Sequence, residues 1–119
     1  MPTLRTVPQS EWRQFFDRMS KALLPGERAE IEVSSPDIGD QIVAEWIPMI
    51  GVTYDSKDDL LDVALDGSDH LVYHPKEIAV EESPSGGLLS IAVLTADGTR
   101  QIVRLKDPLE LPASEGVNA

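Results

Sequence analysis

The chain has 119 residues, no cysteine and a formal net charge of −11 at pH 7. This length suits one domain, and the absence of thiols excludes disulfides, cysteine nucleophiles and cysteine-ligated metal centres. The negative charge opposes nucleic-acid binding, which needs basic residues to neutralise phosphates. No run reaches the roughly 18 apolar residues of a membrane span, and the first residues lack the apolar core of a secretory signal. We therefore expect a cytoplasmic protein without a membrane partner.

A helix is predicted at residues 8–24. Apolar side chains recur there at the helical period and occupy an arc of about 120°; they are Trp12, Phe15, Phe16, Met19, Ala22 and Leu23. Pro8 suits a first helical turn, Thr6 or Ser10 suits the N-cap, and Pro25-Gly26 ends the element. Because this stripe holds three of the six aromatic residues, the helix is expected to supply much of the core.

From residue 28 to residue 105 the apolar period changes to two, which is typical of half-buried strands. Strands are expected at residues 28–33, 41–47, 50–54, 60–65, 70–74, 76–82, 88–94 and 100–105. Ile42, Ala44 and Trp46 are expected on one face of their strand. Pro48 cannot donate to a strand ladder and is expected to mark an edge or a break. The short connections between strands require antiparallel neighbours.

These elements predict an α+β, mainly β fold, in which an N-terminal amphipathic helix packs on an antiparallel sheet of seven to eight short strands. A sheet with this many strands is expected to curl into a half-barrel or a small barrel. In this interpretation residues 1–112 form a single domain, with the helix at 8–24 and the strands at 28–105. Residues 113–119 are expected to form a flexible tail.

The middle of the chain is strongly acidic. Residues 29–99 contain fifteen Asp and Glu residues against two Lys, and six of the aspartates lie within residues 55–69. Carboxylates are ligands that calcium prefers, but no calcium-loop pattern is present. The turns expected at 55–59 and 66–69 lie at opposite ends of a strand about 20 Å long, and aspartate also forms turns by bonding the local backbone. We therefore favour turn formation and solvation, and expect no metal and no other cofactor.

Asp69, His70, His74 and Glu77 form a candidate polar cluster. On a strand the two histidines share a face but lie about 13 Å apart, which is too far for one metal ion. His70 with Asp69, or His74 with Glu77, could form an acid–base pair; the alternative is an ordinary surface or edge position. Motifs for nucleophilic, phosphate-binding, dinucleotide-binding or zinc chemistry do not occur in the sequence. We therefore assign no catalytic residue and expect a protein that is not an enzyme.

Four segments resemble a family of small acidic bacterial proteins catalogued only as a domain of unknown function. They are WRQFF at 12–16, IGVTYDSKDD at 50–59, DHLVYHPKEI at 69–78 and ADGTRQIVRL at 96–105. The resemblance extends over most of residues 9–112. It implies a bacterial, cytoplasmic protein and supplies no catalytic or binding residue.

Three functions are compatible with these observations. The first, which we favour, is a non-enzymatic binding or regulatory module that holds a protein partner or a second copy through an exposed strand edge. The second is a protein that binds a small molecule or a divalent cation at the acidic residues 55–69 and His70. The third is a hydrolase or isomerase that uses carboxylates or His74.

Overall fold

The computed structural model describes residues 2–111, so the tail expected at 113–119 lies outside the described residues. One α-helix and eight strands are present in this part of the chain. In chain order they are β1 (Thr3–Val7), the 3-10 helix η1 (Gln9–Glu11), α1 (Trp12–Ala22), β2 (Arg28–Ser35), β3 (Gly39–Asp55), β4 (Leu60–Leu65), β5 (Ser68–Tyr73), β6 (Pro75–Glu82), β7 (Leu88–Thr95) and β8 (Arg100–Leu109). The predicted fold class, a helix on an antiparallel sheet, is confirmed.

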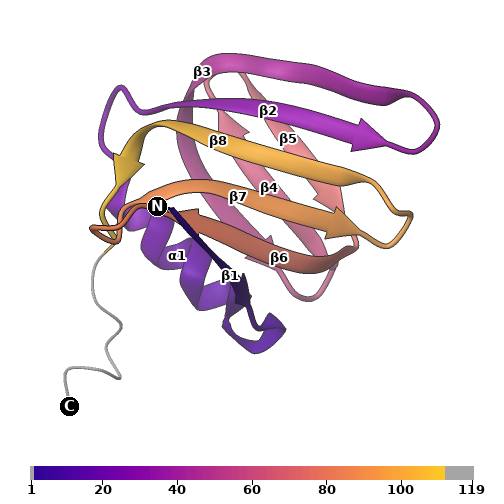
Figure 1. Ribbon diagram of the computed structural model, residues 1–119, viewed down its shortest axis with the longest axis horizontal. Helices are drawn as coiled ribbons and strands as arrows, with labels where there is room; N and C mark the ends of the chain where they lie inside the picture. Colours follow the sequence, from indigo (N-terminus) through magenta and orange to yellow (C-terminus); the bar gives the residue numbers. More distant parts are fainter. Residues whose placement is uncertain (1, 112–119) are drawn as a thin grey trace.

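The eight strands form one sheet in the order β1-β6-β7-β8-β2-β3-β4-β5, and every pair is antiparallel. The sheet curls, so that β4 and β5 lie behind β2, β7 and β8 (Figure 1). His70 on β5 reaches across the interior to Gln101 on β8, with Nε2 and Oε1 2.5 Å apart. Because β1 and β5 remain at the two ends of the strand order, the sheet is curled but not closed.

The helix begins four residues later than predicted. Pro8 has extended backbone angles, η1 forms the first turn, and α1 starts at Trp12. Neither Thr6 nor Ser10 is the N-cap, because Thr6 belongs to β1 and neither helical segment has a side-chain cap. The predicted apolar stripe is confirmed, and its side chains form the centre of the core; the fully buried ones are Trp12, Phe15, Phe16 and Met19.

The strand β1 is absent from the prediction. Four of its five residues are exposed, so the segment carries no alternation of buried and exposed side chains that could mark a strand. It is a strand because its backbone pairs with β6, from Thr3 opposite Glu82 to Val7 opposite Ile78. Edge strands of this kind depend on a distant partner rather than on their own side chains.

The strands expected at 41–47 and 50–54 are one continuous strand, β3, so of the two alternatives given for Pro48, an edge or a break, the break is wrong. β3 pairs with β2 up to Pro48 and with β4 from Met49 onward, and the register shifts on both sides of this point. Pro48 therefore lies where the strand passes from one partner to the next, and its missing N–H is tolerated there. Its carbonyl accepts a hydrogen bond from the N–H of Asp66 at 2.9 Å.

The helix α1 packs against β3. Trp12 and Tyr54 meet edge to face with their ring centroids 5.1 Å apart, and the indole N–H of Trp12 donates to the carbonyl of Val7 at 2.8 Å. The core thus lies between the helix stripe and the inner face of the curled sheet. No helix within residues 2–111 is long and apolar enough to cross a membrane.

Candidate functional site

The four residues of the expected polar cluster do not converge. His70 faces the interior, as its contact with Gln101 shows, whereas its neighbour Asp69 is exposed, because successive strand side chains point to opposite faces. Glu77 is exposed on β6. In the described part of the chain, His70 is not bonded to Asp69 and His74 is not bonded to Glu77.

His74 instead ends a chain of three polar side chains at the junction of β5 and β6. The hydroxyl of Tyr54 donates to Oδ1 of Asp59 at 2.8 Å, and Oδ2 of Asp59 lies 3.3 Å from Nδ1 of His74. The backbone N–H of His74 also donates to the carbonyl of Asp59 at 2.9 Å. Sequence reasoning missed this group because its members come from β3, the β3–β4 turn and the β5–β6 junction, with no local spacing that joins them.

The chemistry open to this group is limited. Burial raises the pKa of the Tyr54 phenol above its ordinary value, and the hydrogen bond and charge of Asp59 raise it further. A phenol of this kind stays protonated at neutral pH and acts as a donor rather than a nucleophile. The side chains of His74 and Asp59 are 66% and 41% exposed, so water competes for both. The arrangement suits a structural role, in which these hydrogen bonds connect the β3–β4 turn to the β5–β6 junction.

The aspartates within residues 55–69, apart from Asp62, lie near the two ends of β4. In the first turn, Oδ1 of Asp55 accepts hydrogen bonds from the N–H groups of Lys57 and Asp58 at 2.9 and 3.3 Å. This is the turn bonding predicted for aspartate. No group of three or more His, Asp or Glu side chains within residues 2–111 is arranged to hold a metal ion.

Asp62 lies on β4 between these turns and is a desolvated carboxylate. Its Oδ1 is buried and accepts no hydrogen bond in the described chain. Burial raises the pKa of Asp62, and the nearby negative charge of Asp69 raises it further. Ionisation of Asp62 is therefore less favourable in the folded protein than for an exposed aspartate.

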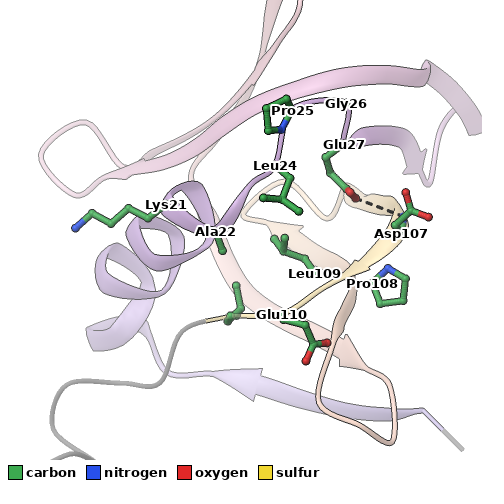
Figure 2. A pocket seen from close by; sticks show the side chains of 11 residues that line it. Lys21, Ala22, Leu24, Pro25, Gly26, Glu27, Asp107, Pro108, Leu109 and Glu110 are labelled. Atoms are coloured by element: carbon green, nitrogen blue, oxygen red, sulfur yellow. Dashed lines mark hydrogen bonds between the residues drawn. The ribbon is translucent and has the colours of Figure 1, made fainter.

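A hollow of about 620 Å³ lies between the α1–β2 connection and the end of β8 (Figure 2). Its walls combine three carboxylates, from Glu27, Asp107 and Glu110, with apolar side chains that include Leu24 and Leu109. Pockets that bind small molecules commonly have this mixture of apolar walls and a few polar groups. The hollow was not predicted, because its residues come from two segments about 80 positions apart.

Glu27 is the buried member of this hollow, with only 8% of its surface exposed. Its Oε1 accepts a long hydrogen bond, 3.4 Å, from the backbone N–H of Asp107. Burial raises the pKa of Glu27 above its ordinary value; this hydrogen bond opposes the shift, and the charge of Asp107 adds to it. Lys21 points away from the hollow (Figure 2) and pairs with Asp17 on the helix at 3.0 Å.

The first half of β3 has a free edge. Residues 39–47 pair with β2 on one side, and within residues 2–111 no strand pairs with their other side, since β4 begins to pair at Met49. The described chain has two further free edges, on β1 and β5. An unpaired edge offers a row of backbone donors and acceptors to another strand.

Apolar side chains surround the free edge of β3. The described chain has nine exposed large hydrophobic side chains, and four lie within residues 38–46, namely Ile38, Ile42, Val43 and Trp46. Asp37, Asp40 and Glu45 lie among them, and residues 33–47 contain no Lys or Arg. We call residues 38–46, with their free backbone edge, the β3 edge surface; it combines apolar and acidic side chains.

The expectation that Ile42, Ala44 and Trp46 share one face of their strand is wrong, and irregular pairing is the reason. Ile42 lies opposite Glu32, and Ala44 lies opposite Ile31. The register shifts once between these two pairs and a second time between Ala44 and Ile47, which lies opposite Ala29. Each bulge inserts an extra residue and changes the face to which the following side chains point. Ala44 is consequently buried, whereas Ile42 and Trp46 are 48% and 37% exposed.

Comparison with known proteins gives a family and no activity. Residues 3–114 match the model of a family of unknown function, DUF5335. An uncharacterized protein of the bacterium Aquifex aeolicus (strain VF5) is 41% identical over 109 residues, which cover 91% of this chain and 96% of that protein. No solved structure matches the chain. The expected resemblance to a bacterial family without a known function is therefore confirmed, and the chain belongs to the DUF5335 family.

Proposed function

We propose that this protein is a non-enzymatic binding module that takes up an extended segment of another protein as an added strand on the β3 edge surface. The observation that carries the proposal is the unpaired edge of residues 39–47, flanked by exposed apolar side chains. In strand addition the backbone hydrogen bonds supply affinity, and the side chains beside the edge supply specificity.

The side chains of the β3 edge surface suit such a partner. Ile42 and Val43 are adjacent in the strand and each is 48% exposed, so an added strand can contact apolar groups on both faces of the sheet. Natural edge strands commonly carry lysine or proline that discourages pairing. Residues 39–46 contain neither residue, and the regular part of this edge, residues 39–42, precedes the bulges that interrupt the strand.

Charge indicates the composition of the partner segment. Asp40 and Glu45 lie on the β3 edge surface, Asp37 precedes it, and no basic residue of 33–47 offsets them. A segment in which apolar residues alternate with Lys or Arg complements this surface. Edge-to-edge pairing of two copies would bring the same acidic residues together, and like charges opposite one another destabilise paired strands. A basic segment of another protein is therefore preferred over a second copy.

The polar groups of the described chain give less support to catalysis. In the Tyr54–Asp59–His74 group, the side chains of Asp59 and His74 are exposed to water, and the buried phenol of Tyr54 has a raised pKa and stays protonated. Burial raises the pKa of the carboxyl groups of Glu27 and Asp62, yet neither carboxyl is hydrogen-bonded to a histidine in the described chain. A binding module accounts for the exposed apolar edge, which a catalytic role leaves without a purpose.

Binding of defined peptides tests the proposal. The probe is a dye-labelled, end-capped peptide of eight residues in which valine and arginine alternate, and its counterpart carries glutamate in place of arginine. Fluorescence anisotropy should show saturable binding of the basic peptide only. Hydrogen exchange should show new protection at residues 39–46, because added strand hydrogen bonds slow exchange there.

Edge variants locate the binding. Ile42→Lys and Val43→Lys should each weaken binding of the basic peptide at least tenfold, because they remove apolar contact and add a repelling charge. Leu71→Lys, on the free edge of β5, is the matched control and should leave the affinity unchanged. Hydrogen-exchange protection of β1 or β5 by the peptide, in place of residues 39–46, would refute the assignment. It would also be refuted if the natural protein is a dimer and Val43→Lys dissociates that dimer, because the edge would then bind a second copy.

A second candidate function is binding of a small organic cation in the hollow of Figure 2. It is favoured by the buried carboxyl of Glu27 beside apolar walls, with the amine of Lys21 directed elsewhere. A thermal-shift titration with putrescine should then raise the melting temperature of the protein, since binding to the folded state stabilises it. Glu27→Gln should abolish this rise in melting temperature. If Mg²⁺ raises the melting temperature as much as putrescine does, the effect is ionic screening and not binding at a specific site.

A further inference from the structure

Trp46 has a backbone conformation that its side chain does not favour. Its φ is 51°, in the left-handed region where a bulky residue is a genuine outlier. Asp59 and His74 also have positive φ, but Asp and His are among the residues enriched there. Trp46 occupies the bulge where β3 changes register against β2. Glycine is the usual residue for a left-handed bulge position, so the tryptophan needs another explanation.

The neighbouring structure holds Trp46 in place. Nη1 of Arg28 donates to the carbonyl oxygen of Trp46 at 2.9 Å, and Arg28 itself pairs with Pro48 in the strand register. The two aromatic pairs of the described chain, Trp12–Tyr54 and Phe15–Phe16, leave Trp46 out. The residue is also absent from the buried core. Its indole is therefore neither required by the bulge nor part of the core.

Strained residues that the surrounding structure holds in place concentrate at functional sites, and the inference runs from the observed outlier to a function. Trp46 belongs to the β3 edge surface and directly follows the exposed Glu45. An indole ring is the aromatic group that attracts Lys and Arg side chains most strongly. Tryptophan is also enriched among the few residues that dominate the energy of protein interfaces.

We propose that Trp46 is the specificity-determining residue of the β3 edge surface, and that its indole binds one Arg or Lys side chain of the docked segment by a cation–π contact. This inference rests on the proposed function, which supplies the docked strand. Glu45 and Asp40 attract basic segments in general, whereas Trp46 selects the position at which the cation must lie. The strain at Trp46 arises because a side chain with a Cβ atom, here the one that carries the indole, occupies a position of positive φ.

The selectivity test uses the alternating valine–arginine peptide with each of its four arginines replaced in turn by citrulline, a neutral analogue of similar shape. One replacement should weaken binding to the natural protein about two- to tenfold more than the others. Trp46→Phe should keep part of this preference, because the aromatic face remains. Trp46→Leu should abolish it while the peptide still binds, since the apolar and acidic groups of the edge are unchanged.

A stability comparison tests the strain without any peptide. Trp46→Gly should melt at a higher temperature than Trp46→Ala, because both lack the indole and only glycine tolerates the positive φ. At Tyr73, an exposed aromatic residue of β5 without positive φ, the order should reverse, since glycine weakens an ordinary strand relative to alanine. The opposite order at Trp46 would show that the position carries no such strain and would overturn this part of the inference.

The peptide results also separate the two proposals. If the basic peptide binds and Val43→Lys abolishes its binding, but Trp46→Leu keeps the citrulline preference, the edge function stands and the role of Trp46 is refuted. If the natural protein binds none of the peptides at millimolar concentration, the proposed function fails and the role of Trp46 fails with it.

Discussion

One hydroxyl group joins Ser20 of the helix to both backbone polar groups of Val52 on β3. Oγ of Ser20 donates to the carbonyl of Val52 at 2.7 Å and accepts from its N–H at 2.9 Å. This is the part of β3 that has left β2 and pairs only with β4. The helix thus takes the place that a neighbouring strand would occupy, and it covers one of the edges of the curled sheet.

Replacing Ser20 by alanine should destabilise the protein by about 1–3 kcal/mol, because two partly buried backbone groups of Val52 lose their partner. The measurement is the free energy of unfolding in urea. Ser10→Ala is the matched control: Ser10 is exposed in η1, and its replacement should change stability by less than about 0.5 kcal/mol. Equal effects of the two substitutions would mean that the Ser20 contacts contribute nothing to stability.

Glu27→Gln should stabilise the protein at neutral pH and leave its stability unchanged in acid. Burial raises the pKa of folded Glu27 above the ordinary value of 4.5, so the natural protein loses stability as the pH rises from the unfolded pKa through the folded one. Glutamine carries no charge at any pH and can still accept the hydrogen bond of Asp107. The measurement is unfolding of both proteins between pH 3.5 and 7. A glutamine variant that is less stable at pH 7 would contradict the raised pKa.

Tyr54 should ionise at a higher pH than a free tyrosine. Burial and Asp59 both raise the pKa of its phenol from 10.0, and Tyr73→Phe leaves Tyr54 as the only tyrosine. Absorbance at 295 nm then follows its ionisation directly. Adding Asp59→Asn should lower the ionisation midpoint of Tyr54, because the charge of Asp59 is removed. Burial should still keep this midpoint above the ordinary value of a tyrosine. A midpoint that Asp59→Asn leaves unchanged would show that the Tyr54–Asp59 bond does not form in solution.

Arg104 should stabilise the outer face of the sheet in a salt-dependent manner. Its Nη1 lies 3.2 Å from Oε1 of Glu30 and 2.8 Å from Oε1 of Glu32, and both glutamates are only 18% exposed. Arg104→Gln leaves these two carboxylates without a counter-charge and should cost about 1 kcal/mol at low salt, given that the arginine is partly solvated. In 1 M NaCl, where the Debye length is about 3 Å, the loss should shrink.

The control for Arg104 is Arg5→Gln, which removes a single and more exposed pair with Glu82 and should have a smaller effect. Adding Glu30→Gln and Glu32→Gln to Arg104→Gln should restore most of the lost stability, because the unpaired carboxylates are removed with the arginine. If the triple variant is less stable than Arg104→Gln alone, the effect arises from packing of the arginine stem.

The sequence alone predicted the features that depend on neighbouring residues. The apolar stripe from Trp12 to Leu23 packs as expected, because a helix buries one arc of side chains whatever its partner. The alternation of buried and partly exposed side chains in β4 and the hairpin between β7 and β8 were likewise predicted. Both depend on period-two patterns and turn residues, which act over a few positions of the chain. The turn expected at residues 55–59 is present for the same reason, whereas Asp69, expected in the next turn, lies on β5.

Only the tertiary structure decided how these pieces meet. Pairing with β6 makes β1 a strand, and the change of partner at Pro48 makes β3 continuous. The bulge at Trp46 then exposes a residue that strict alternation placed with Ala44. Strand pairing and register depend on contacts between residues far apart in the chain, and a shift of one residue reverses the face of every side chain after it. The sequence therefore determined which residues could form a core, and the pairing of distant strands determined which edge was left free to bind a partner.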